Sequence, residues 1–253
     1  MQSDTEGVGH MPDDKKQRIA DQMTCTLSRM LENNQRVFHG VSSHMPMIAM
    51  MMARQLHAPD MIHLDIAGGI NPASCAKDRF SSAGPEIFTT GRAYFPLQEV
   101  FDLSMRGELD VAFLSGVQFD AVGQVNASII GEYTKPKVRL PGGAGSAVLI
   151  PTAKRAILWR TKHDRRTFVE ALDFVTTKGN AWRLVTPLCT FAMQAGRWIV
   201  ESIHPYSSLE EVQKNTGFSV ICENLQYTPE PTLAERAALR RIDPGNLRYL
   251  ELE

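Results

Sequence analysis

Apolar and polar positions in the first half of the chain follow two alternating periods. Between Lys15 and Asn33 the apolar residues recur at every third or fourth position, which is the period of a helix with one face against a core. Short apolar runs bounded by turn residues follow and indicate strands. The expected helices cover residues 15–33, 45–57 and 96–108, and the expected strands cover residues 36–43, 61–69 and 109–116, with an irregular stretch over 71–95. Helices that alternate with strands favour a parallel sheet covered on both faces.

The second half is richer in β-branched and aromatic residues and predicts more strands than helices. Strands are expected over residues 124–133, 146–151, 155–161, 167–177, 182–187 and 197–205, and helices over residues 207–217 and 232–241. No repeat and no linker interrupts the pattern, so we expect one α/β domain over residues 15–253, built on an open, mostly parallel sheet with helices on both faces. Residues 1–14 are polar and acidic, without the basic start and apolar middle of a secretory signal, and are expected to be disordered.

Composition argues against several classes of function. A formal net charge of −1 over 253 residues provides no general field for nucleic acid or for an anionic membrane. No segment reaches the ~18 apolar residues of a membrane span, and we expect a cytoplasmic protein. The four cysteines form no CxxC pair and are expected to be reduced, buried thiols. The histidines at positions 39, 44, 57 and 63 fit no zincin spacing, so we predict no metal site and expect surface or satisfied core histidines.

The stretch "APDMIHLDIAGGIN" (58–71) predicts a buried strand followed by a glycine turn. Open α/β sheets place their chemistry at the carboxyl ends of such strands. The residue at this strand tip, Ile66, carries no reactive group. Because side chains along a strand alternate between its two faces, the neighbouring Asp65 is expected to point away from the face of Ile66, unless a bulge at the following glycines turns it.

Two further stretches carry candidate chemistry. The loop "LPGGAGSA" (140–147) has glycines at 142, 143 and 145, so its backbone N–H groups can approach an anion or a developing oxyanion; the alternative is a plain tight turn. It matches neither GxGxxG nor a Walker loop, which argues against a nucleotide site. In "GVQFDAVGQVN" (116–126), Gln118 and Asp120 follow a predicted strand, and taken alone they are better explained as turn formers.

Taken in order, several segments of the chain resemble the B (β) subunit of glutaconate-CoA-transferase-like class I CoA transferases. These segments are "APD" (58–60), "QFDAVGQVN" (118–126), "PKVRLPGG" (136–143) and "NTGF" (215–218), within a match from about residue 16 to 247. The resemblance implies an open α/β fold and an acyl-CoA thioester as the substrate. It implies coenzyme A only as part of that substrate, with no permanently bound cofactor. It also implies an A-like (α) partner, in an α2β2 or larger heteromer.

The resemblance further implies which residues form the site. In transferases of this family, a glutamate after the strand that follows "APD" attacks the thioester, and aligned on "APD" that glutamate falls on Ile66. Asp65 remains as the candidate catalytic residue of this chain. The candidate residues for contacting substrate or CoA are Gln118, Asp120, Asn126, Gly142, Gly143, Ala144 and Gly145. The family's glycine loop tends to read Gly-Ser-Gly-Gly-Ala, and this chain departs from that pattern.

Three functions follow as alternatives. In the first, the chain is the β component of a heteromer that hydrolyses an acyl-CoA or cleaves a carbon–carbon bond of its acyl part. Family lineages without the glutamate do this in ring-opening hydrolysis and in decarboxylation of a glutaconyl-type CoA. In the second, it is a true CoA transferase for a dicarboxylic or keto acid, using Asp65 or a partner residue. In the third, it is a non-catalytic component that shapes the partner's site. The first is preferred because isoleucine cannot form an anhydride.

Overall fold

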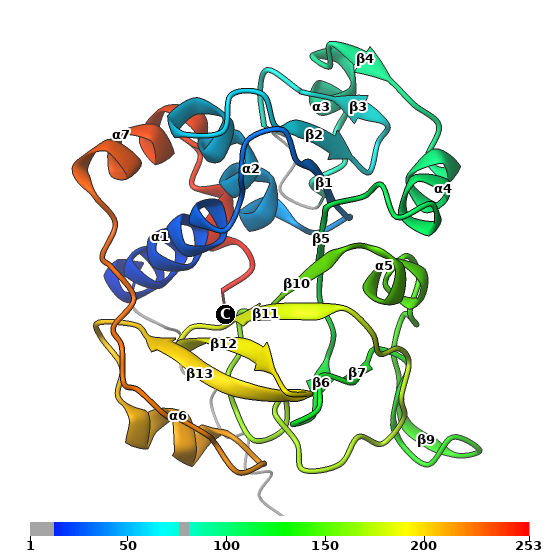
Figure 1. The fold of residues 1–253 in the computed structure, drawn as a ribbon, viewed down its shortest axis with the longest axis vertical. Helices are drawn as coiled ribbons and strands as arrows, with labels where there is room; N and C mark the ends of the chain where they lie inside the picture. The colour runs from blue at the N-terminus through cyan, green and yellow to red at the C-terminus, as the bar shows by residue number, and fades with distance from the viewer. Residues whose placement is uncertain (1–12, 76–80, 253) are drawn as a thin grey trace, which may run out of the picture.

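The computed structural model describes residues 13–75 and 81–252, and within them a nine-stranded sheet organises the chain. Its strands are β1 (Arg36–His39), β2 (Ile62–Asp65), β3 (Gly69–Ile70), β4 (Ala93–Tyr94), β5 (Val111–Leu114), β10 (Arg155–Trp159), β11 (Ala181–Val185), β12 (Cys189–Gln194) and β13 (Arg197–Ile203). They lie in the order β13-β12-β11-β10-β5-β1-β2-β3-β4 (Figure 1). The inner strands β11, β10, β5, β1 and β2 are parallel, and both edges are antiparallel. The predicted open, mostly parallel sheet is confirmed.

Helices and two small β-ladders surround this sheet. The helices are α1 (Asp13–Arg29), α2 (His44–Leu56), α3 (Pro85–Thr89), α4 (Gln98–Met105), α5 (Ser146–Thr152), α6 (Leu209–Asn215), α7 (Leu233–Ile242) and the 3₁₀-helix η1 (Leu247–Tyr249). The small ladders pair β6 (Gln118–Phe119) with β7 (Val125–Asn126), and β8 (Ile129–Gly131) with β9 (Pro136–Arg139). No helix of the described residues is long and apolar enough to cross a membrane.

The two faces of the sheet are built from alternate residues of the same strands. Val111 and Phe113 of β5 belong to a cluster with side chains of α1 and α2. Ala112 and Leu114 of the same strand belong to a cluster with side chains of α4 and α5. Figure 1 shows α1, α2 and α7 on one side of the sheet and α4 and α5 on the other. Every residue of β5 is buried, as expected for a parallel strand covered on both faces.

Helix α2 lies between the sheet on one side and α7 with η1 on the other, and most of its circumference is therefore apolar. Its Met45 and Met50 pack in the cluster with the sheet, whereas Met47 and Met52 pack in the cluster with α7 and η1. All four methionine side chains are fully buried. Pro46 lies in the first turn, where a missing N–H breaks no helical hydrogen bond. The methionine-rich run therefore fills the core, as its flexible side chains suit.

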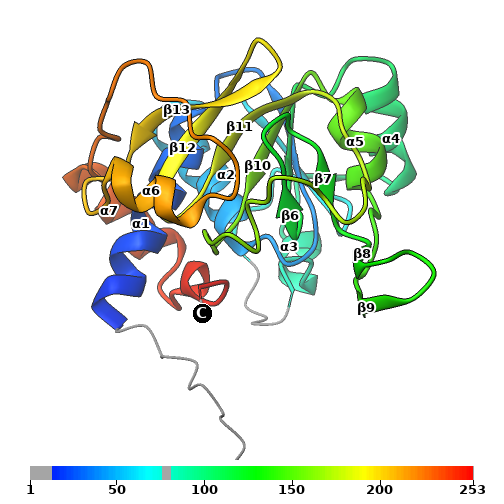
Figure 2. The same cartoon turned by 90° about the horizontal axis from the view of Figure 1, so that it is seen from below.

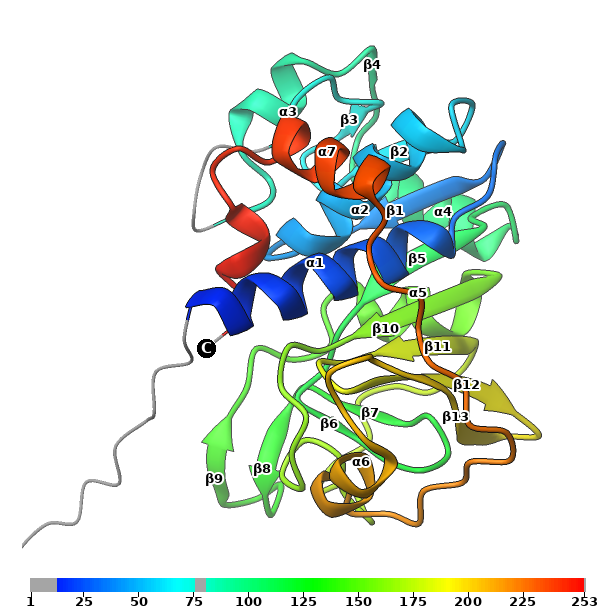
Figure 3. The same cartoon turned by 90° about the vertical axis from the view of Figure 1, so that its left-hand side faces the viewer.

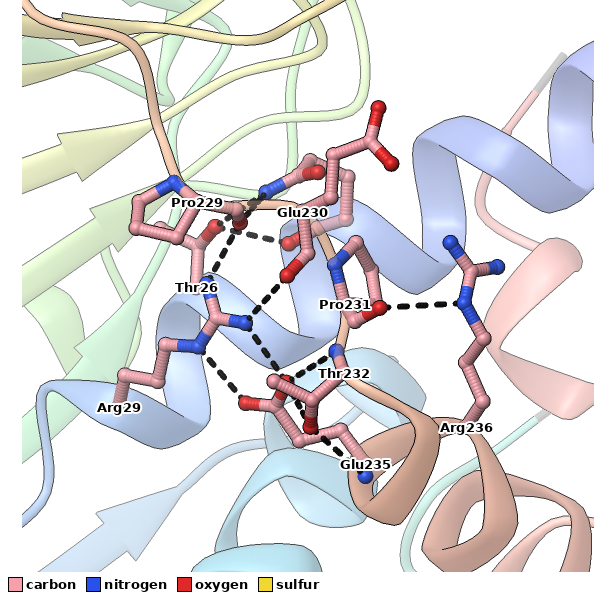
Figure 4. Close-up of polar contacts among 9 residues, drawn as sticks. Thr26, Arg29, Pro229, Glu230, Pro231, Thr232, Glu235 and Arg236 are labelled. Carbon is pink, nitrogen blue, oxygen red and sulfur yellow. Dashed lines mark hydrogen bonds and ion pairs between the residues drawn. The ribbon is translucent and has the colours of Figure 1, made fainter.

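Arg29 of α1 makes most of the contacts that hold the segment leading into α7, and Gln22 of α1 adds a hydrogen bond to the Pro229 carbonyl oxygen at 3.0 Å. The Arg29 guanidinium donates to the two carboxylate oxygens of Glu235, at 2.7 and 2.6 Å, and to the carbonyl oxygens of Pro229 and Glu230, at 2.7 and 2.9 Å (Figure 4). Glu235 also accepts from the amide of Thr232, which completes a capping box at the start of α7. This contact joins residues 206 positions apart and attaches the last helix to the first.

Two of the predicted strands are wrong. Residues 146–151 begin α5 instead, with Leu149 and Ile150 buried, because a short apolar run has no periodicity that separates a strand from a buried helix. Residues 167–177 form an irregular segment in which Phe168 and Thr177 make isolated bridges to β6 and β7. Phe168 packs in the core, Val175 is exposed, and the segment forms no ladder. Strand β12 was not predicted, and neither was the helical turn α3.

The remaining predictions on chain organisation are mixed. Residues 1–12 lie outside the described residues, but Asp13 and Asp14, predicted to be disordered, are the first residues of α1. Cys25, Cys75 and Cys189 are buried free thiols, as predicted, and Cys222 is a half-buried free thiol. The start of α1, the C-terminal end and the β8–β9 hairpin lie at the same end of the molecule (Figure 2 and Figure 3).

Candidate functional site

A cavity of about 1090 Å³ lies at the carboxyl ends of the parallel strands. Gly40 follows β1, Ile66 follows β2, Ser115 follows β5 and Arg160 follows β10, and all four line the cavity. The first turn of α1 adds Lys15. This is the place where open α/β sheets bind their ligands.

The lining combines an apolar part with charged groups. The apolar part includes Phe38, Ile66, Leu97, Phe101, Leu114 and Leu149. The charged groups are Lys15, Arg160, Lys162, Glu211 and Glu251. Such a lining suits a ligand with an apolar segment and an anionic segment.

The strand tip directs two neighbouring residues to opposite sides. Ile66 lines the cavity, and Asp65 is not among the described residues that do. The Asp65 side chain is fully buried, with Oδ2 3.0 Å from Nε2 of His39 and Oδ1 accepting from the Ala67 amide at 2.6 Å. The turn that follows, at Gly68, does not bring the carboxylate into the cavity. A catalytic role for Asp65 stays a prediction, and its position weighs against that role.

The glycine loop brings all four of its candidate residues to the cavity. Gly142, Gly143, Ala144 and Gly145 line it directly before α5. Gly142 and Ala144 have positive φ angles of 93° and 40°, so the chain turns sharply here. The Ser146 hydroxyl closes the turn by donating to the carbonyl oxygen of Gly143. Among the described residues, the amides of Gly143, Ala144 and Gly145 donate to no protein acceptor, so they are available to an oxyanion.

The other three candidates for contacting substrate lie outside the described lining of the cavity. The Asn126 amide donates to Oε1 of Gln118 at 2.7 Å and to the carbonyl oxygen of Ile129 at 2.6 Å. The carboxylate of Asp120 accepts from the backbone amides two and four residues later. These are the turn-forming contacts that the residue types alone suggest. The motif fixes the backbone that carries Ala127, which does line the cavity.

His163 lines the cavity and was not singled out by the sequence analysis. Its Nδ1 lies 2.8 Å from Oγ1 of Thr186 and its Nε2 lies 3.0 Å from Oγ1 of Thr216. Burial lowers the pKa of His163 to about 3, so the ring is neutral at physiological pH. Two signals pointed here: its place just after a predicted strand, and the motif "NTGF", which contains Thr216.

Comparison with known proteins agrees with this geometry. The sequence model of the family described as Coenzyme A transferase matches residues 20–215. The chain is 31% identical over 243 residues to the B subunit of 3-oxoadipate CoA-transferase from Pseudomonas knackmussii, covering 88% of this chain and 92% of that protein. It is 27% identical over 249 residues to the B subunit of glutaconate CoA-transferase from Acidaminococcus fermentans, covering 87% and 90%.

Solved structures give the same result at the level of the fold. The decarboxylase AibA/AibB matches with a TM-score of 0.87 and 28% identity, over 92% of this chain and 98% of that chain. IpdAB of Rhodococcus jostii RHA1 shares the fold, with a TM-score of 0.80 and 22% identity over 93% and 98%. Since the family match spans most of the sheet and the glycine loop, the chain belongs to the coenzyme A transferase family.

Proposed function

We propose that this chain is the β component of a heteromer with an A-like (α) partner, and that it acts on an acyl-CoA thioester without becoming covalently attached to CoA. The reaction is hydrolysis of the thioester or cleavage of a carbon–carbon bond in the acyl part. The observation that carries the proposal is the strand tip, where Ile66 lines the cavity and Asp65 contacts His39. The two transferase relatives, both of them B subunits, and the two-component decarboxylase AibA/AibB support the assembly and the class of substrate.

The lining of the cavity suits this chemistry. The free amides of Gly143, Ala144 and Gly145 can polarise a thioester carbonyl as negative charge develops on its oxygen. The apolar side chains of Ile66 and Phe101 exclude water beside them, which strengthens those hydrogen bonds. The cations of the lining, Lys15, Arg160 and Lys162, suit the phosphates of CoA. An acid or base that activates water or substrate is expected from the A-like partner.

CoA transfer is the second candidate, favoured by the activities for which the two transferase relatives are named. It requires a carboxylate in place of the glutamate that the family resemblance assigns to position 66. Asp65 is fully buried and held by the Ala67 amide, so it is not placed to attack a thioester in the cavity, and a partner residue is the other candidate. A third candidate is a non-catalytic role in which this chain only shapes the partner's site. It requires the same heteromer. It predicts that no substitution in this chain lowers the reaction rate while leaving assembly and substrate binding unchanged.

The candidates differ in whether CoA becomes attached to this chain. We expect no CoA adduct on it when the purified heteromer is incubated with thioesters of dicarboxylic and 3-oxo acids, because no carboxylate of this chain's strand tip faces the cavity. We also expect turnover without an added acceptor acid. Intact-mass spectrometry, before and after hydroxylamine treatment, makes the first measurement, and assays for free thiol and CO₂ make the second.

The products separate the two forms of the proposed reaction. Thiol release without CO₂ identifies hydrolysis of the thioester. CO₂ release with the thioester retained identifies decarboxylation, and a retained thioester whose mass has gained one water identifies hydrolysis of a ring carbon–carbon bond. A glutamate-bearing transferase of the family, treated in the same way, is the positive control for the adduct. A CoA adduct on Asp65, together with ping-pong exchange between two acids, would establish CoA transfer and overturn the proposal.

A further inference from the structure

Three buried side chains of metal-ligating type meet behind the strand tip. His39 ends β1, and His63 and Asp65 lie on the neighbouring strand β2, where the register pairs His39 with Asp65. All three are fully buried. One ring nitrogen or carboxylate oxygen from each lies within 4.8 Å of those of the other two. The cavity described above does not use this cluster.

The hydrogen bonds around His39 and Asp65 leave two acceptors face to face. Nδ1 of His39 lies 3.1 Å from the carbonyl oxygen of Gly40, which accepts a hydrogen bond from a proton on Nδ1. Nε2 lies 3.0 Å from Oδ2 of Asp65, and neither atom has a hydrogen-bond partner among the described residues. Oδ1 of Asp65 is fixed by the Ala67 amide. Two lone pairs at this distance repel each other unless a cation lies between them.

His63 completes the same cluster with an unsatisfied ring. Neither of its ring nitrogens has a hydrogen-bond partner among the described residues, although the side chain is fully buried. The prediction of a satisfied core histidine is therefore wrong for His63. Its ring lies edge-on to His39, with centroids 5.0 Å apart and an interplanar angle of 68°. A neutral imidazole always has one nitrogen with a free lone pair, and a buried ring without a hydrogen-bond partner has that nitrogen available as a ligand.

We propose that His39, His63 and Asp65 bind a divalent metal ion of the zinc class. The ligands are Nε2 of His39, Oδ2 of Asp65 and one ring nitrogen of His63. Two neutral imidazoles with one carboxylate are a donor set that suits zinc. The Gly40 carbonyl and the Ala67 amide act as the outer partners that orient metal-ligating histidines and carboxylates.

A metal at this place would join β1 to β2 directly behind the cavity. His39 precedes Gly40 and Asp65 precedes Ile66, and both of those neighbours line the cavity. The ion would therefore fix the spacing of two cavity-lining segments without touching the substrate. Because its ligands are fully buried, the metal enters as the chain folds rather than afterwards.

The test loads the metal during synthesis. The full chain, without an affinity tag that binds metal, is produced in minimal medium supplemented with Co²⁺ and, in parallel, with Zn²⁺. We expect about one metal ion per folded chain by elemental analysis. We also expect visible absorption bands of four-coordinate Co²⁺ in the cobalt-loaded protein. Protein refolded from denaturant in the presence of a chelator should melt at a lower temperature than the metal-loaded protein. Protein refolded with Zn²⁺ should regain the melting temperature of the metal-loaded protein.

Matched histidine variants assign the metal to the cluster. His63→Asn should lose the bound metal, whereas His57→Asn should keep it, because His57 is exposed at the end of α2 and contacts the carbonyl oxygen of Leu31. His63→Cys keeps a ligand at the position and should add a thiolate-to-cobalt charge-transfer band. Folded wild-type chain without stoichiometric metal would overturn the proposal and leave a proton as the shared cation. Unchanged cobalt bands in folded His63→Asn would overturn it as well.

Discussion

Gly68 turns the chain out of β2 directly after the strand tip. Its φ angle is +93°, and its amide donates to the carbonyl oxygen of Asp65 at 2.9 Å. Its own carbonyl oxygen accepts from the Phe95 amide at 2.9 Å. A Cβ at this position would lie 2.5 Å from the carbonyl oxygen of Phe95. The turn that follows Ile66 therefore depends on a residue that has no side chain.

We expect Gly68→Ala to lower the free energy of unfolding by more than ~3 kcal/mol. A positive φ alone costs an alanine roughly 1 to 2 kcal/mol, and here a clash with fixed backbone is added. Gly107→Ala is the matched control, because Gly107 has a φ of +72° with no atom within 4 Å of its Cβ. Urea unfolding of both variants makes the measurement. Equal losses in the two variants would show that the Phe95 carbonyl group moves away at little cost.

At the strand tip, the sequence predicts only those features that nearby positions in the chain determine. The opposite directions of Asp65 and Ile66 follow from the period of a strand, and the turn follows from the glycines. The contact between Asp65 and His39 depends on the register of β2 against β1, which no local pattern specifies. Local pattern also does not show which residues reach the cavity, and the family resemblance predicted that Gln118, Asp120 and Asn126 contact the substrate. Their side chains bond to the loop itself.

At the scale of elements, the contact between Arg29 and Glu235 attaches α7 to α1. Glu235 is 8% exposed, and its carboxylate accepts from both Arg29 and Thr232. Burial raises the pKa of Glu235, but hydrogen bonds from Arg29 and Thr232 outweigh it, so the pKa lies below the usual 4.5. A carboxyl group with a lowered pKa in the folded state stabilises the fold above the pKa it has when unfolded. That stabilisation is lost as pH falls through the lower, folded value.

We expect Glu235→Gln to lower the free energy of unfolding at pH 7 by roughly 2 kcal/mol, the scale of a hydrogen bond to a charged group. The difference from wild type should shrink as pH falls below the unfolded pKa, because wild-type Glu235 then becomes neutral too. Glu230→Gln is the control, since Glu230 pairs with Arg18 at 3.6 Å in an exposed position and should contribute less than about 1 kcal/mol. Denaturant unfolding across this pH range would refute the assignment if the difference stayed constant.

The elements themselves were predictable where the pattern was long or capped. Helices α1, α2 and α7 have clear periodicity or end signals, and Ser208 and Thr232 cap α6 and α7 as their sequences suggest. The run "SAVLIP" (146–151) is too short for its period to decide, and it forms α5 because the glycine loop starts a helix there. Strand β12 pairs with both β11 and β13 and buries its first four residues, so it has no apolar–polar alternation to indicate a strand.

At the scale of the whole molecule, apolar side chains remain exposed around the cavity. Val41 and Leu97 line it and are 61% and 40% exposed. Phe88 and Tyr94 do not line the cavity, but their exposed rings also contact each other, with centroids 4.4 Å apart. Exposed apolar groups at the rim of a site are typical of a surface that another protein chain covers.

We expect the chain to form a stable complex with its A-like partner, with an interface well over the ~1,600 Å² of a standard complex. Val41→Asp should weaken this complex at least ~10-fold, because it places a charge in the buried apolar contact. Leu233→Asp should not, since Leu233 is 86% exposed at the start of α7 and does not line the cavity. Sedimentation of the two co-expressed chains measures both. Turnover of CoA esters by this chain alone, as a monomer, would contradict the assembly.

The contact between α1 and α7 also has a consequence for folding during translation, because its two partners are synthesised far apart in time. A ribosome completes Arg29 when the partner, Glu235, is still 206 residues from being synthesised. Until then, the outer face of α2 lacks part of its cover, because Ala238 and Leu239 of α7 supply that part. The nascent chain therefore carries a methionine-rich surface for most of its translation, and chaperones favour such surfaces. A transcript that ends early would yield a chain whose N-terminal half folds incompletely and is open to aggregation or degradation.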